Sequence, residues 1–171
     1  LTDSLEFSAG IRYDQQEVTA SGTAGSYEAQ EWQPRFTLTQ RWTANHMTYA
    51  SIARGFRGGG ANAPAAPLLF YQGDSVWTYE IGDKFTTDDR TLTINTAIYF
   101  NDYQHYIGQN SLTPAPGPVA VNLNTGDVQS YGVELEAIYA PTDWFQLQSG
   151  VSYNHARITD DSEFEETFPL G

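Results

Sequence analysis

Residues Ser130–Tyr139 read SYGVELEAIY, with an apolar side chain at every second position. One face of this stretch carries Tyr131, Val133, Leu135, Ala137 and Tyr139, and the other carries Ser130, Gly132, Glu134 and Glu136. A period of two is typical of a β-strand with one apolar and one polar face, whereas a helix repeats every 3.6 residues. The stretch therefore predicts a strand.

The same alternation recurs along most of the chain. It is clear in Leu5–Tyr13, Trp77–Phe85, Thr91–Phe100 and Phe145–Tyr153, and the composition is strand-like in Arg35–Trp42 and Met47–Phe56. No window of comparable length shows a helical stripe. The sequence therefore predicts an all-β chain with about seven strands.

The connections between these windows alternate in length. Long connections are expected at roughly 17–30, 57–75, 108–127 and from 155 onward, and tight turns at Thr43–His46, Thr87–Arg90 and Pro141–Trp144. Strict alternation places every long connection at one end of the sheet. This predicts an antiparallel up-and-down meander, because the crossovers of a Greek-key sandwich would break the alternation.

Strand length and aromatic placement favour a membrane barrel. The windows run to about ten residues, which matches a tilted spanning strand better than an ordinary soluble one. Aromatic residues gather at strand ends, with Trp42 and Tyr49 beside one tight turn and Trp144 beside another. In hydrocarbon the two edges of an open seven-stranded meander would be unsatisfied. We therefore expect residues 1–171 to be part of a larger transmembrane β-barrel, and a soluble β-sandwich binding module is the alternative.

The composition excludes several other classes of protein. The net charge of −13 opposes binding to nucleic acid, and the absence of Cys excludes disulfides and thiolate metal clusters. A spanning helix needs about 20 nearly continuous apolar residues, and no such run is present. The chain opens at Leu1 without the basic and apolar segments of a signal peptide. We expect it to be a piece of a longer protein or a mature part of one.

Several segments resemble one known family in family order. They are Tyr49–Arg57 followed by three glycines, Tyr79–Phe85 (YEIGDKF), Leu92–Tyr103, Ser130–Glu136 and the turn Pro141–Trp144. Together they cover most of residues 30–158 and resemble the barrel of TonB-dependent outer-membrane receptors. The resemblance implies a closed barrel of about 22 strands filled by an N-terminal plug. It places the plug, the TonB-contacting segment and the terminal strand outside residues 1–171.

The resemblance also implies a function and a location. A protein of this kind would be a multi-pass β-barrel of the cell outer membrane that actively takes up a scarce nutrient such as an iron–siderophore complex. Its partners would be the TonB energy-coupling complex (through the plug), outer-membrane lipid and a small-molecule metal chelate, with no nucleic acid. A passive porin-like or adhesive outer-membrane barrel without a plug is the alternative within the membrane class.

Candidate ligand contacts lie where strands open into the long connections. Arginine forks suit carboxylate or phosphate groups, and binding residues are disproportionately found on loops. The residues that we expect to contact substrate at the extracellular mouth are Arg54, Arg57, Tyr71, Tyr106, Gln109 and Asn110.

Catalytic and metal sites are not expected. His46, His105 and His155 are far apart in sequence, whereas a metal needs clustered ligands. The glycine-rich segment Arg54–Gly60 lacks the Gly-Lys-Ser/Thr ending of a phosphate-binding loop. No nucleophile stands out beside Asp102 and His105, so we predict no catalytic residue, no metal ligand and no cofactor.

Three glutamates fall on the polar faces of the predicted strands. Glu134 and Glu136 share one face, and Glu80 lies on the polar face of the window Trp77–Phe85. In a barrel these carboxylates would face the interior. We expect them to pair with basic residues of the plug or of the wall rather than to perform acid–base chemistry.

Overall fold

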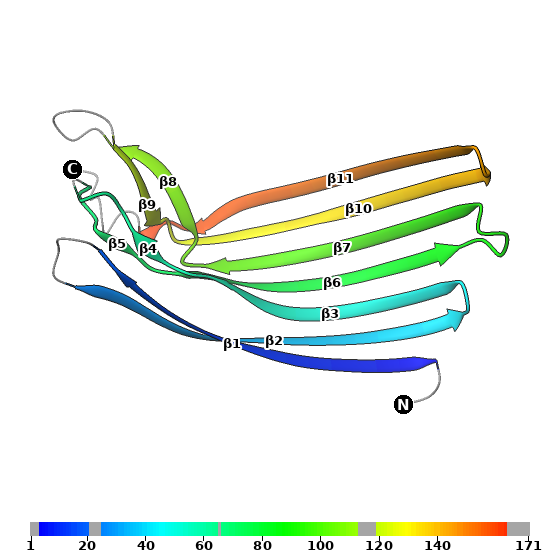
Figure 1. Ribbon diagram of the computed structural model, residues 1–171, viewed down its shortest axis with the longest axis horizontal. Helices are drawn as coiled ribbons and strands as arrows, with labels where there is room; N and C mark the ends of the chain where they lie inside the picture. Colours follow the sequence, from blue (N-terminus) through cyan, green and yellow to red (C-terminus); the bar gives the residue numbers. More distant parts are fainter. Residues whose placement is uncertain (1–3, 21–24, 65, 113–118, 164–171) are drawn as a thin grey trace.

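A computed structural model of the chain describes residues 4–20, 25–64, 66–112 and 119–163, and for residues 110–112 and 119 the backbone alone. The long strands are β1 (Leu5–Thr19), β2 (Ser26–Thr43), β3 (His46–Arg57), β6 (Asp74–Thr86), β7 (Leu92–Gln104), β10 (Asp127–Thr142) and β11 (Phe145–Asp160). They form one sheet in the order β1-β2-β3-β6-β7-β10-β11 (Figure 1). The short strands β4 (Gly60–Ala61) with β5 (Phe70–Tyr71), and β8 (Ile107–Leu112) with β9 (Val119–Asn124), form two separate hairpins.

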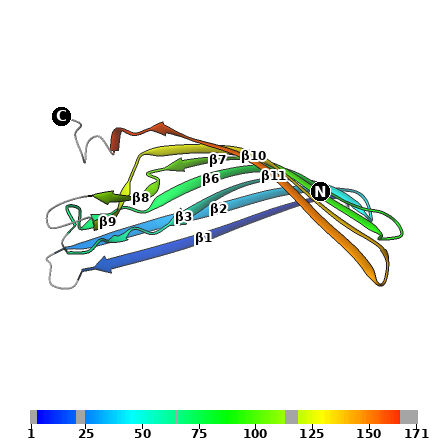
Figure 2. The ribbon, with the colours of Figure 1, turned by 90° about the horizontal axis from the view of Figure 1, so that it is seen from above.

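The predicted seven-stranded meander is confirmed. Every pair of neighbouring strands in the large sheet is antiparallel. Figure 2 shows one curved layer with β1 at one edge and β11 at the other. In the described part of the chain no second sheet is stacked on this layer as a β-sandwich would require.

The outward face of this layer is apolar, and no other segment covers it among the residues that the structure describes. Ala50, Ile81, Ile98 and Val133 stand directly opposite one another on β3, β6, β7 and β10. Ile81 is 66 % exposed and Ile98 is 62 % exposed, which is unusual for the middle of a sheet. The apolar residues of the alternation therefore lie on a surface rather than in a protein core.

Aromatic residues border this apolar band on the side of the long connections. Tyr79, Phe100 and Tyr131 form the next outward row. One row further on, Asp102 lies opposite Gln129, whose Nε2 donates a hydrogen bond to Asp102 Oδ1 at 3.1 Å. The outward face thus becomes polar beyond the aromatic row, as it does at a membrane–water interface.

The opposite face is polar and closely packed around two glycines. Tyr49 lies over Gly82, its direct partner on the next strand, and Tyr99 lies over Gly132 in the same way. A Cβ atom at either glycine would collide with the tyrosine above it. The glycines on the polar face therefore make room for aromatic rings that stabilise the neighbouring strand.

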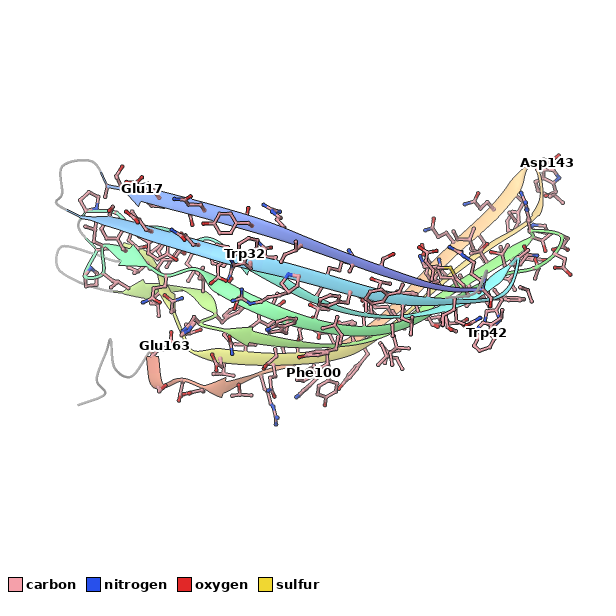
Figure 3. All side chains as sticks on the ribbon, turned by 90° about the horizontal axis from the view of Figure 1, so that it is seen from below. Glu17, Trp32, Trp42, Phe100, Asp143 and Glu163 are labelled. Carbon is pink, nitrogen blue, oxygen red and sulfur yellow. The ribbon has the colours of Figure 1, made fainter. Side chains whose placement is uncertain are left out.

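Tight turns and long connections lie at opposite ends, as predicted. β2 and β3 are joined by Ala44–Asn45, and β10 and β11 by Asp143–Trp144. Figure 3 shows Trp42 and Asp143 at the end with the tight turns, and Glu17 and Glu163 at the other end.

The long connections contain more structure than expected. β1 and β2 remain paired up to Thr19 and Ser26, so the connection predicted at 17–30 is much shorter. The connections predicted at 57–75 and 108–127 contain the hairpins β4–β5 and β8–β9. Backbone pairing continues beyond the apolar band because it does not depend on alternating side chains, whereas the alternation that located most of the strands ends with this band.

Candidate ligand-binding mouth

The two hairpins β4–β5 and β8–β9 are joined at the end with the long connections by an asparagine side chain. Asn62 Nδ2 donates to the carbonyl oxygen of Asn122 at 2.7 Å, and the Asn122 backbone nitrogen donates to Asn62 Oδ1 at 2.8 Å. The amide group of Asn62 thus pairs with the backbone of β9 as a further strand would.

A second asparagine makes the reciprocal contact. The backbone nitrogen of Gln72 donates to Asn124 Oδ1 at 2.9 Å, and Asn124 Nδ2 donates to the Gln72 carbonyl oxygen at 3.1 Å. Val121 and Leu123 lie on β9 next to these contacts in the chain and are almost completely buried. We call the two contacts made by Asn62 and Asn124 the asparagine clasp, and it holds the two connections together.

The start of β8 is fixed by an ion pair between β3 and β6. Arg57 and Asp74 are direct cross-strand partners, and Arg57 Nε donates to Asp74 Oδ1 at 3.1 Å. The backbone nitrogen of Ile107 donates to Asp74 Oδ2 at 3.0 Å, and Arg57 Nη2 donates to the Ile107 carbonyl oxygen at 3.1 Å. The Asp74 side chain is 5 % exposed, so this carboxylate is held inside the protein with its charge compensated.

Two tyrosines complete an aromatic hollow around Arg57. The guanidinium carbon of Arg57 lies 5.5 Å from the centre of the Tyr106 ring, and the rings of Tyr103 and Tyr106 meet edge to face at 5.6 Å. The hollow has a volume of about 380 Å³ and is lined by Gly55, Phe56, Arg57, Asp74, Val76, Tyr103 and Tyr106. It offers aromatic faces and one guanidinium edge, a combination that suits a planar or anionic ligand group.

Protonation states in this hollow follow from its contacts. The hydrogen bonds that Arg57 donates to the Asp74 carboxylate raise the pKa of the Arg57 guanidinium, so Arg57 stays charged. Burial raises the pKa of the Tyr103 phenol, and neighbouring Tyr106 and Asp74 raise it further. Tyr103 is therefore a neutral hydrogen-bond donor at physiological pH.

A second hollow lies beside the clasp. It has a volume of about 310 Å³ and is lined by Leu68, Phe70, Tyr71, Gln72, His105, Asn124 and Glu163. Tyr71 lies close over Gly60, and His105 Nδ1 contacts the carboxylate of Glu163. His105 adopts a left-handed backbone conformation with φ of 56° at the corner between β7 and β8.

The structure brings some of the predicted contact residues together and separates others. Arg57 and Tyr106 share the aromatic hollow, and Tyr71 lines the hollow beside the clasp. Gln109 lies exposed on β8, and the side chain of Asn110 falls outside the described part of the chain.

Arg54 lies apart from this group. It contacts the carboxylate of Glu31, and its Nη1 donates to the carbonyl oxygen of Trp32 at 3.0 Å. β2 and β3 cease to pair beyond Arg35 and Ala53, and Arg54 bridges the strands where they separate. These contacts indicate a structural role in the wall.

Four residues of the mouth were not among the sequence candidates. Asp74 and Tyr103 belong to the aromatic hollow, and Asn62 and Asn124 form the clasp. Asp74 would have been found from the register that places it opposite Arg57. The asparagines carry no sequence signal, because an amide that pairs with a distant backbone is indistinguishable from one in an ordinary loop.

The inner face of the wall holds the predicted glutamates. Tyr49 donates its hydroxyl to Glu80 Oε1 at 2.6 Å. Glu136 accepts hydrogen bonds from Asn95 at 3.1 Å and from Gln148 at 2.8 Å. Glu134 and Glu136 also line a hollow of about 440 Å³ on this face. The glutamates therefore share one surface, as the alternation predicts.

The three histidines have separate partners. His46 binds Asp83, His105 contacts Glu163, and the His155 ring packs on Tyr131 at 5.2 Å. Among residues 4–20, 25–64, 66–112 and 119–163, no group of three or more His, Asp or Glu side chains is arranged to hold a metal ion.

Comparison with known proteins now assigns the chain to a family. The family described as TonB dependent receptor-like, beta-barrel matches residues 1–170. The chain belongs to the TonB-dependent receptor family. This assignment confirms the resemblance found in the sequence.

Solved TonB-dependent receptors have the same fold over this length. The ferric yersiniabactin uptake receptor FyuA from Yersinia pestis matches with a TM-score of 0.73 and 20% identity over 95% of this chain and 26% of its own. The FrpB iron transporter from Neisseria meningitidis matches with a TM-score of 0.70 and 18% identity over 94% of this chain and 25% of its own. BauA, the ferric preacinetobactin receptor from Acinetobacter baumannii, matches with a TM-score of 0.67 and 19% identity over 92% of this chain and 23% of its own. The chain thus spans about a quarter of these receptors.

Membership of this receptor family fixes the location of the apolar face. TonB-dependent receptors are β-barrels of the outer membrane, and they are transporters rather than enzymes. The outward row through Ile81 and Ile98 therefore faces lipid, and the polar face lines the barrel interior. Separately, none of the helical segments among the described residues is long and apolar enough to cross a membrane.

Proposed function

We propose that this chain forms part of the wall and mouth of an energised importer that takes up an iron–siderophore complex or a similar metal chelate. The family assignment supports uptake, and the names of FyuA and BauA as ferric siderophore receptors support this class of substrate. The observation that carries the proposal is the aromatic hollow around Arg57, Tyr103 and Tyr106 at the outer end of the wall.

The charge of this hollow favours a particular mode of recognition. Asp74 compensates the positive charge of Arg57, so the hollow is close to neutral. A chelate would therefore bind chiefly by stacking on Tyr106 and Tyr103. The free edge of the Arg57 guanidinium would donate a hydrogen bond to an oxygen of the ligand. Tyr71 would contribute from the second hollow. Gln109 and Asn110, on β8, would be further contacts, and Arg54 would be one in addition to bridging β2 and β3.

Energy coupling is proposed to act from inside the barrel. A plug domain and its TonB-contacting segment would lie in the remaining part of the receptor, because this chain matches only about a quarter of its relatives. Glu80, Glu134 and Glu136 would face that plug and pair with its basic side chains. A passive porin-like or adhesive barrel would need no such partner.

An uptake experiment tests the proposal. Cells that carry the full receptor would be supplied with radioactive iron bound to a panel of siderophores, with and without the tonB gene. We expect one chelate to accumulate only when TonB is present. Uptake that persists without TonB would indicate a passive barrel, and uptake of no metal chelate would remove the proposed substrate class.

A substitution in the aromatic hollow tests the mouth residues. We expect Tyr106→Ala to weaken chelate binding about ten-fold, because it removes the ring on which Arg57 and the ligand would stack. Tyr153→Ala is the matched control, since Tyr153 is 59 % exposed on the outward face of β11. Equal binding by the two variants would place the ligand elsewhere.

A further inference from the structure

A row of polar side chains crosses the apolar, lipid-facing surface near the tight turns. Gln40, Thr48, Asp83 and Thr96 stand directly opposite one another on β2, β3, β6 and β7. The adjacent row toward the long connections is apolar and consists of Leu38, Ala50, Ile81 and Ile98. On the turn side, Phe85 and Ile94 form an apolar pair. The polar row is thus an interruption within an apolar surface.

The position of Asp83 on the outward face is fixed by its two neighbours. Gly82 lies beneath the Tyr49 ring on the inner face, and the Lys84 ammonium lies 5.9 Å from the centre of the same ring. Because successive side chains of a strand point to opposite faces, Asp83 points outward. It therefore shares its face with Ile81 and Phe85.

Asp83 is held in place but keeps an open oxygen. His46 Nε2 lies 2.7 Å from Asp83 Oδ2, and the two side chains are 35 % and 38 % exposed. In the described part of the chain, Oδ1 of Asp83 and the hydroxyl of Thr96 have no hydrogen-bond partner. Beside them, Trp42 Nε1 donates to Thr48 Oγ1 at 3.1 Å and orients that hydroxyl.

The row lies at the depth of lipid headgroups. Asp83 comes three residues before the end of β6 at Thr86, which places it roughly 8 Å from the turn in a tilted strand. Tight turns of outer-membrane barrels are periplasmic, and a headgroup layer of about 6 Å borders each side of the hydrocarbon core. The carboxylate therefore reaches the headgroup region of the periplasmic leaflet.

We propose that this row binds the headgroup of a phospholipid that carries a primary ammonium group, such as phosphatidylethanolamine. The ammonium would donate hydrogen bonds to Asp83 Oδ1 and to the hydroxyl oxygens of Thr48 and Thr96, which flank Asp83 on either side. Asp83 Oδ2 is already paired with His46, and a cationic headgroup would supply the partner for Oδ1, which otherwise faces lipid alone. This inference depends on the outer-membrane location and not on the proposed transport of a chelate.

The charges around the row select against other headgroups. Arg41 and Lys84, the nearest cationic side chains on β2 and β6, lie on the inner face, where Arg41 binds Glu6 at 3.1 Å and Lys84 lies over Tyr49. An anionic headgroup would therefore meet the Asp83 carboxylate with only His46 beside it and no arginine or lysine to compensate its charge. A choline headgroup has no N–H to donate, so it would gain charge attraction without hydrogen bonds.

Native mass spectrometry of the full receptor tests the proposal. The purified receptor would be titrated with phosphatidylethanolamine, phosphatidylcholine and phosphatidylglycerol that carry identical acyl chains. We expect the ethanolamine lipid to bind about ten-fold more tightly than the other two, as a charge-assisted hydrogen bond would predict. Equal binding of the ethanolamine and choline lipids would overturn the proposal, as would a preference for the anionic lipid.

Substitutions locate the site. We expect Asp83→Asn to reduce binding of the ethanolamine lipid to the level of the choline lipid, and Thr96→Val to reduce it by a smaller factor. Asp143→Asn is the matched control, because Asp143 lies in the turn between β10 and β11 at the same end of the molecule. Heat-modifiable migration on a gel would establish that each variant is a folded barrel. An unchanged preference in folded Asp83→Asn would refute the assignment to this row.

Discussion

Single side chains on the outward face determine how the wall meets the membrane, and Ile98 illustrates this. Ile98 is 62 % exposed and stands opposite Ile81 and Val133 in the middle of the apolar band. A guanidinium at this position would lie in hydrocarbon. We expect Ile98→Arg to lower the free energy of unfolding of the intact receptor by about 2–4 kcal/mol, measured by denaturant unfolding in lipid vesicles.

The control for this change lies on the same strand. Asn95 points to the inner face, where its Nδ2 donates to Glu136 Oε2 at 3.1 Å. An arginine there would meet water and the Glu136 carboxylate, so Asn95→Arg is expected to change the free energy of unfolding by less than about 1 kcal/mol. Equal losses for the two variants would contradict the assignment of the faces.

Asp89 controls a pH-dependent contact in the turn between β6 and β7. Its Oδ1 accepts hydrogen bonds from Thr87 Oγ1 at 2.6 Å and from the nitrogen and hydroxyl of Thr91 at 3.0 and 2.9 Å. These bonds, that from Thr87 above all, hold the pKa of Asp89 below its usual range. Because folding lowers this pKa, the ionised carboxylate stabilises the turn above the unfolded-state pKa, and the stabilisation is lost as pH falls through the folded-state pKa.

Carboxyl NMR of the receptor labelled at aspartate checks this prediction. We expect Asp89 to titrate at lower pH in the folded receptor than in a peptide that spans the turn. Asp89→Asn should be less stable than the unchanged receptor at neutral pH, and the two should converge in acid. Identical titration midpoints in receptor and peptide would show that the threonine bonds do not form.

Among the elements, the hairpins β4–β5 and β8–β9 are coupled by the asparagine clasp. Asn124→Ala removes both hydrogen bonds to the backbone of Gln72. We expect residues 68–73 to exchange amide hydrogen faster, with a loss of local stability of about 1–2 kcal/mol, measured by hydrogen exchange and mass spectrometry on the full receptor.

Asn122→Ala is the control for the clasp. Asn122 takes part through its backbone nitrogen and oxygen, which the substitution retains. Its exchange rates should therefore match those of the unchanged receptor. If Asn124→Ala also leaves residues 68–73 as protected as before, the two connections are held by apolar burial at Val121 and Leu123 and not by the clasp.

The long strands could be predicted from the sequence because apolar residues occupy every second position along them. Alternation located β10 and β11 because a lipid-facing surface imposes the same period as a buried one. β4 has two residues and lies in a glycine-rich stretch, so no period could reveal it. The same holds for β8 and β9, whose pairing is fixed by contacts with residues far away in the chain.

The candidate site was predictable only in part for a related reason. Arg57 and Tyr106 stood out because of their residue types at the ends of strands, and the structure places them in one hollow. Arg54 has the same residue type three positions earlier, yet it bridges β2 and β3. Register and strand separation decide between such roles, and neither can be read from one sequence.

At the scale of the whole molecule, the residues that the structure describes place no protein core against the apolar face of the curved layer. Val121 and Leu123 are the only almost completely buried apolar side chains in the described part of the chain, and both belong to the hairpin β8–β9 rather than to the wall. The wall is instead stabilised by backbone pairing, by inner-face contacts such as Tyr49 with Glu80, and by lipid on the outside.

The outward face therefore requires an apolar solvent. Ile11, Ile81 and Val151 are each about two-thirds exposed, and apolar surface gains about 25 cal/mol per Å² when it leaves water. In plain buffer the only way to cover this face is contact with other copies of the protein. We expect the receptor to elute as one monodisperse species in detergent and to aggregate when the detergent is removed, measured by size-exclusion chromatography with light scattering. A monodisperse folded monomer in plain buffer would mean that these side chains pack inside the protein, and the membrane wall would then be the wrong description of the sheet.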